Sequence, residues 1–103
     1  MYIVNERMKA KNDLSVKLKV DITKHGSQYI AYSPALDIST VGATKSEARK
    51  RFAELVDLYF AELLEAGTLK DALEELGWKK QRTAWQPPQV SHESLDLRIP
   101  SLA

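Results

Sequence analysis

The sequence predicts an α+β fold, in which an antiparallel three-stranded meander is followed by a long helix, a short helix and a returning strand. Two observations predict it. Apolar and polar residues alternate over residues 14–23, which is typical of a strand with one buried and one exposed face. A wide apolar stripe with helical spacing then covers Lys45–Ala66. Because the first strand is apolar on one face only, we expect helices to cover a single face of the sheet.

The length and composition indicate one domain. The chain has 103 residues, with 15 Lys and Arg, 14 Asp and Glu, and no cysteine. We place the domain at residues 14–103, after an N-terminal extension of residues 1–13 that shows no sustained period. The lack of cysteine excludes a disulfide scaffold, a thiolate zinc site and a cysteine nucleophile. The near-neutral charge, with no long apolar run and no leader-like start, predicts a cytoplasmic protein without general affinity for nucleic acids or membranes.

The other two strands of the meander follow from turn residues. A turn at residues 24–27 contains Gly26, which can adopt a positive φ. The return strand Gln28–Ser33 is rich in aromatic and β-branched residues and stops before Pro34, since proline cannot donate to a central ladder. A third strand is predicted over residues 38–43.

A capping box opens the long helix. The Thr44 hydroxyl can accept the backbone N–H of Glu47, whose side chain can reach back, and Gly67 is suited to end the helix. At ~1.5 Å per residue the helix is about 33 Å long, whereas a six-residue strand covers about 20 Å. The helix must therefore overhang the sheet. The overhang carries apolar residues that we expect to contribute to self-association: Tyr59, Phe60, Leu63 and Leu64.

The rest of the chain is less regular. A second, shorter helix is predicted over residues 69–76, with Gly77 as its stop. Residues 78–93 contain two adjacent prolines and are predicted to be irregular. Residues 94–99 alternate again between apolar and polar side chains, and we expect them to form a final strand, parallel to a strand of the meander.

Three short motifs lie on these elements: YIAYSPAL at residues 29–36, GATKSEA at residues 42–48, and LGW at residues 76–78. Together with the order of the elements, they resemble the HicB family of antitoxins over residues 16–99. The resemblance implies a partial RNase H-like fold without catalysis. It also implies an antitoxin of a type II toxin–antitoxin system, which binds a small HicA-like toxin and occludes its mRNA-cleaving site without a cofactor.

The sequence departs from the family pattern in two places. Where the family commonly has a Leu-Pro-Gly-Cys-like stretch, this chain has Leu-Asp-Ile-Ser at residues 36–39. Family members that repress their own operon usually carry a C-terminal DNA-binding segment, whereas only residues 100–103 follow the expected last strand. We therefore expect no direct DNA binding by this chain.

Aromatic residues are the candidates for partner binding: Tyr29, Tyr32, Trp78 and Trp85. Tyrosine and tryptophan dominate binding hot spots. The two tyrosines lie on opposite faces of their strand, so at least one of them leaves the helix-covered side. The alternative for the tryptophans is that both cover the end of a small core.

Charged residues do not predict catalysis. Asp21, Glu54 and Asp57 imitate the carboxylates of a metal-dependent nuclease only loosely, because Asp21 lies on the polar face of its strand. Charged residues are mostly exposed, and we expect no catalytic residue, metal site or cofactor. The basic run at residues 45–51 contains favourable i,i+4 pairs with glutamates, which is typical of an exposed helix face.

Two alternatives to the antitoxin remain open. One is an orphan HicB-like protein without a toxin partner, which serves as an oligomeric scaffold or a small-ligand-binding module. The other is a residual nuclease that depends on the aspartates named above. The apolar overhang of the long helix predicts a homo-oligomer, a dimer or a tetramer.

Overall fold

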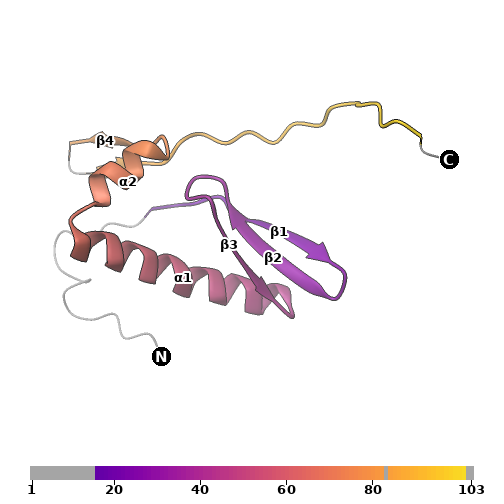
Figure 1. The fold of residues 1–103 in the computed structure, drawn as a ribbon, viewed down its shortest axis with the longest axis horizontal. Helices are drawn as coiled ribbons and strands as arrows, with labels where there is room; N and C mark the ends of the chain where they lie inside the picture. The colour runs from indigo at the N-terminus through magenta and orange to yellow at the C-terminus, as the bar shows by residue number, and fades with distance from the viewer. Residues whose placement is uncertain (1–15, 83, 102–103) are drawn as a thin grey trace.

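The computed structural model describes residues 16–82 and 84–101, so the predicted extension at residues 1–13 lies outside the described residues. The fold is α+β, as predicted (Figure 1). A three-stranded antiparallel sheet has the order β1-β2-β3, and two further strands, β4 and β5, form a separate sheet. The elements are β1 (Asp21–His25), β2 (Gln28–Ser33), β3 (Ile38–Gly42), α1 (Lys45–Ala66), α2 (Leu69–Glu75), β4 (Lys79–Gln81) and β5 (Ala84–Gln86).

The first strand is shorter than its alternation predicts. β1 begins at Asp21, and residues 16–20 are outside any strand. The reason lies in the register, because Asp21 pairs with Tyr32, one residue before the end of β2. The chain turns away at Pro34, so residues before Asp21 have almost no β2 backbone to pair with. The prediction for β2 is confirmed, and β3 ends one residue earlier than predicted.

Both ends of α1 are confirmed, and so is its capping box. The Thr44 Oγ1 accepts the Glu47 backbone N–H at 3.0 Å. The Glu47 carboxylate in turn accepts the backbone N–H of Ala43 at 2.6 Å, one residue before the position that a capping box usually uses. Gly67 ends the helix with φ 72°, a left-handed conformation. Among the described residues, no helix is long and apolar enough to cross a membrane.

Helix α1 packs on one face of the sheet and contacts all three strands. The centre of this contact is a cluster of Ala31, Ala48 and Phe52, against which Ile22 and Tyr29 also pack. Two alanines that are 0% exposed allow the helix and the sheet to approach closely. Gly42 allows an equally close approach at the end of β3, because a Cβ there would lie only 2.7 Å from the Cα of Ala48.

A second cluster lies beyond the end of the sheet. Ala35 and Leu36, from the turn after β2, are buried against Leu73 of α2 and Trp78. The Trp78 Nε1–H donates to the Ala35 carbonyl oxygen at 2.8 Å. Helix α2, which ends one residue earlier than predicted, therefore packs against the β2–β3 turn as well as against α1.

Two predictions for the C-terminal part are wrong. Residues 79–86, expected to be irregular, contain the antiparallel hairpin of β4 and β5, whose three-residue strands are too short to show a period. The returning strand at residues 94–99 is not formed. The alternation there is real, but no strand of the described chain pairs with it, and its apolar side chains are exposed. Figure 1 shows this segment running away from the two helices.

Candidate functional site

The face of the β1–β2–β3 sheet opposite α1 is the first candidate site. Ala31 faces the helix, so its neighbours Ile30 and Tyr32 face the other way. The strand register extends these two positions into two rows across the sheet. We call this surface the open face; its rows are Thr23–Ile30–Val41 and Asp21–Tyr32–Ser39.

The open face has an apolar centre and a polar rim. Val41 is 38% exposed and Ile30 is half-buried beside it. Thr23 and Ser39, at the rim, are exposed. A small apolar centre surrounded by polar groups is the arrangement found in many protein–protein interfaces.

Tyr32 is held in place at one end of the open face. Its hydroxyl donates to the Asp37 Oδ1 at 3.0 Å. That hydrogen bond raises the pKa of Tyr32, and burial and the negative charges of Asp37 and Asp21 raise it further. Asp37 itself has φ 55° in the turn before β3, where its backbone N–H donates to the Ser33 carbonyl oxygen. Tyr32 is therefore a neutral aromatic group whose hydroxyl is anchored to a defined turn.

Of the four aromatic residues predicted to bind a partner, one lies on the open face. Tyr29 is on the helix side of β2. Trp78 is only 3% exposed, and Trp85 is half-buried in the same cluster. The alternative prediction, that both tryptophans cover the end of the core, is thus confirmed. Sequence reasoning missed Ile30 and Val41. The period of two along β2, which places Ile30 on the same face as Tyr32, could have found Ile30, whereas Val41 joins it only through the β2–β3 register.

The residues predicted for self-association are partly used inside the chain. Tyr59 and Phe60 contact each other edge to face, with 5.5 Å between ring centroids, and both pack against the second cluster. Burial raises the pKa of Tyr59, and the charge of Glu75 adds to the effect. Leu63 is half-buried and Leu64 is 57% exposed, so the remaining apolar surface of the overhang is small.

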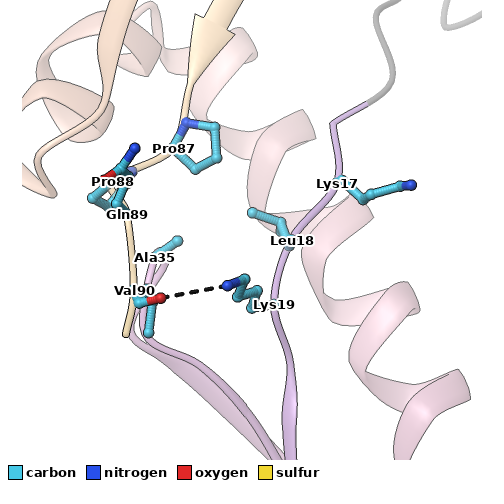
Figure 2. Close-up of a pocket in the computed structure, with 8 residues that line it drawn as sticks. All are labelled: Lys17, Leu18, Lys19, Ala35, Pro87, Pro88, Gln89 and Val90. Carbon is cyan, nitrogen blue, oxygen red and sulfur yellow. Dashed lines mark hydrogen bonds between the residues drawn. The ribbon is translucent and has the colours of Figure 1, made fainter. Parts of the chain in front are cut away.

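A groove lies between residues 17–19 and residues 87–90, and Figure 2 shows the side chains that line it. Its volume is about 400 Å³. Lys19 contributes positive charge, and its ammonium donates to the Val90 carbonyl oxygen at 3.4 Å, whereas the Lys17 side chain points away from the groove (Figure 2). Pro87 and Pro88, in the opposite wall, have no backbone N–H. The groove can therefore accept a small anion with an apolar part.

Two pairs of charged residues on α1 interact, one of opposite and one of like charge. Arg51 contacts Glu47 at 3.7 Å, four residues away as predicted, and also donates to the Val41 carbonyl oxygen at 3.0 Å. Burial raises the pKa of Asp57, and repulsion by Glu54 adds to the effect. Within residues 16–82 and 84–101, no group of three or more metal-ligating side chains is close enough together to hold a metal ion.

The open face, with Ile30 and Val41 at its centre and Tyr32 at its end, is the candidate surface for a protein partner. The groove beside Lys19 is the surface best formed for a small ligand. Comparisons with protein-family models, with curated proteins and with solved structures found no match to this chain.

Proposed function

We propose that the chain is a HicB-like antitoxin of a type II toxin–antitoxin system, which binds a small HicA-like toxin and occludes its mRNA-cleaving site. The observation that carries the proposal is the open face, a sheet surface with an apolar centre that no described helix covers. The kind of partner, a small HicA-like toxin, is inferred from the resemblance of the sequence to HicB antitoxins.

Local structure supports the resemblance at each of its three motifs. The YIAYSPAL motif forms β2 and the turn after it, and it supplies the buried Ala31. In GATKSEA, Gly42 contacts the first turn of α1 and Thr44 caps the helix. In LGW, Trp78 is a buried member of the second cluster. The meander followed by a long helix agrees with a partial RNase H-like fold, whereas residues 94–99, which pair with no described strand, depart from it.

Inhibition would be steric. A toxin that cleaves mRNA needs positive charge to hold the phosphate backbone. Asp21 and Asp37 place negative charge around Tyr32 at one end of the open face. Ile30 and Val41 offer apolar area beside it. A surface of this kind can cover a basic RNA-binding site through complementary charge and apolar contact.

Co-expression with the product of the neighbouring reading frame tests the proposal. We expect that product to stop growth alone, to be neutralised by this chain and to co-purify with it. Val41→Lys places a positive charge at the centre of the open face and should weaken binding about 100-fold, by ~2–3 kcal/mol. Leu58→Lys is the matched control, because Leu58 is an apolar residue, 56% exposed, on α1.

A neighbouring product that is not toxic, or that does not co-purify with the wild-type chain, would contradict the antitoxin function. If Val41→Lys binds the toxin as tightly as Leu58→Lys does, the toxin binds elsewhere on the chain. The co-expression result therefore tests the antitoxin function, and the comparison of Val41→Lys with Leu58→Lys tests whether the open face is the binding surface.

A second candidate function is a small-ligand-binding module, which the groove favours. The charge of Lys19 and the volume of the groove suit a small organic anion. Under this alternative, a panel of such anions raises the melting temperature of the wild-type chain, and Lys19→Gln removes the effect. If no anion shifts the melting temperature, the groove is only a surface feature.

A further inference from the structure

The segment at residues 94–99 has the pattern of a strand but no strand partner in the described chain. Its three apolar residues are among the most exposed of the described chain: Leu95 is 72% exposed, Leu97 77% and Ile99 87%. They alternate with Asp96 and Arg98, so an extended backbone places all three on one side. A row of exposed apolar side chains indicates a surface that another chain covers.

Two contacts show how the C-terminal segment runs past the sheet. The Lys19 ammonium donates to the Val90 carbonyl oxygen at 3.4 Å, and His92 lies 3.6 Å from the carboxylate of Asp21. Both pairs are separated by 71 positions, so the segment advances in the same direction as the chain leading into β1. Figure 1 shows the segment continuing past this sheet.

This register explains why residues 94–99 stay unpaired within the part of the chain that the structure describes. With the same offset, residue 94 would lie beside Thr23 and residue 96 beside His25, which is the last residue of β1. The chain turns at Gly26, so Leu97 and the residues after it extend past the strand. The edge of β1 that no described strand covers is too short for them.

The segment is complementary to itself in one antiparallel register. When Leu97 lies opposite Leu97 of a second copy, Leu95 faces Ile99 and Asp96 faces Arg98, on both sides of the two-fold axis. Antiparallel pairing centred on Asp96 or on Arg98 places like charges opposite each other, and so does parallel in-register pairing. A shift by one residue places leucines opposite charged side chains. Only the register centred on Leu97 satisfies both charge and apolar pairing.

We propose that residues 94–99 pair with the same residues of a second copy of this chain, as an antiparallel two-stranded ribbon with Leu97 on the two-fold axis. Such an interface is isologous, because each copy contributes the same surface. An isolated ribbon is marginally stable. Here His92, two residues before the segment, lies beside Asp21 at the edge of its own sheet, which can support the ribbon. The ribbon does not use Ile30 or Val41 at the centre of the open face, and Asp21 lies at the edge of both surfaces.

Charge exchange within the segment tests the pairing. Sedimentation equilibrium of the wild-type chain should show a monomer–dimer equilibrium. Asp96→Arg and Arg98→Asp each place two pairs of like charges across the ribbon and should raise the dimer dissociation constant at least ~10-fold. The double exchange Asp96→Arg with Arg98→Asp restores opposite charges and should return the dissociation constant to near the wild-type value. Because both side chains are exposed, none of these variants should alter the fold.

Cysteine substitution tests the register directly, since the chain has no cysteine of its own. Leu97→Cys places two thiols opposite each other, within reach of a disulfide, and should give a covalent dimer with oxidised glutathione. Leu95→Cys is the matched control of similar exposure. Its two thiols would be about 14 Å apart along the ribbon and should cross-link far more slowly.

Three results would overturn the proposal. They are a wild-type chain that remains monomeric at all accessible concentrations, a double charge exchange that dissociates as readily as the single ones, and equal cross-linking rates for the two cysteine variants. A dimer that persists in Leu97→Asp would place the contact elsewhere, the exposed side of α1 around Leu64 included.

Discussion

The Trp78 indole and the Ala35 carbonyl oxygen form a 2.8 Å hydrogen bond between two residues that are each 3% exposed. They lie 43 positions apart in the sequence. The bond connects the segment after α2 with the turn between β2 and β3. Leu73 and Leu36 pack around it, so the second cluster holds the C-terminal hairpin against the rest of the fold.

Substitution of Trp78 separates the hydrogen bond from the packing. Trp78→Phe keeps an aromatic ring but leaves the buried Ala35 carbonyl oxygen without this donor, at an expected cost of ~1–3 kcal/mol in the free energy of unfolding. Trp78→Ala also leaves a cavity and should cost ~3–5 kcal/mol. Urea titration followed by circular dichroism measures both. Trp85→Phe, at a half-buried position of the same cluster, is the control and should cost less. If Trp78→Phe and Trp85→Phe lower the free energy of unfolding equally, the hydrogen bond between Trp78 and Ala35 makes no special contribution to stability.

The close approach of Gly42 to Ala48 predicts a large effect of one added methyl group. In Gly42→Ala, the new Cβ would lie 2.7 Å from the Ala48 Cα and 2.9 Å from the Glu47 carbonyl carbon. Backbone atoms cannot give way as a flexible side chain can, so we expect a loss of ~3 kcal/mol in the free energy of unfolding. In Gly26→Ala, the added Cβ meets no atom within 4 Å, and only the strain of φ 64° remains, about 1 kcal/mol. In thermal unfolding, Gly42→Ala should have a much lower melting temperature than Gly26→Ala. The reverse order would contradict the packing argument.

Ser33 predicts a substitution that stabilises the protein. Its side chain is 0% exposed, and the Oγ has no hydrogen-bond partner among the described residues. A buried hydroxyl without a partner costs ~1–3 kcal/mol. Ser33→Ala should therefore raise the free energy of unfolding by about 1 kcal/mol, after allowance for the small cavity. Ser39→Ala, on the exposed rim of the open face, removes a hydroxyl that water can solvate and should be close to neutral. A loss of stability in Ser33→Ala would show that the hydroxyl has a favourable partner.

Local signals allowed the central part of the fold to be predicted. The strand Gln28–Ser33 is bounded by a glycine turn and by Pro34, and α1 is bounded by a capping box and by Gly67. Each of these limits depends on residues next to it in the sequence. Two errors, the start of β1 and the strand expected at residues 94–99, have a common cause. Alternation shows that a segment can form a strand, but the partner strand decides whether it does.

Residues 14–23 and 94–99 both show that strand formation depends on a partner strand. Both segments alternate, yet the first becomes a strand only from Asp21, where β2 still offers a partner, and the second has no partner among the described strands. The open face was equally hidden in the sequence. Ile30 and Val41 are 11 positions apart and become neighbours only through the β2–β3 register, which depends on the length of the turn between the strands.

The raised pKa of Asp57 predicts how one carboxylate changes stability with pH. Burial and the charge of Glu54 favour the protonated form in the folded chain. The folded state therefore gains from Asp57 at a pH below the unfolded pKa, near 3.8, and loses that gain as the pH rises through the higher folded pKa. At pH 7 the charged group opposes folding, so Asp57→Asn should raise the melting temperature there, and the difference from wild type should shrink towards pH 3. Glu62→Gln, which removes an exposed carboxylate from the same helix, is the control for the change in net charge. If the benefit of Asp57→Asn is the same at pH 3 and pH 7, or no larger than that of Glu62→Gln, then burial and Glu54 do not govern the titration of this group.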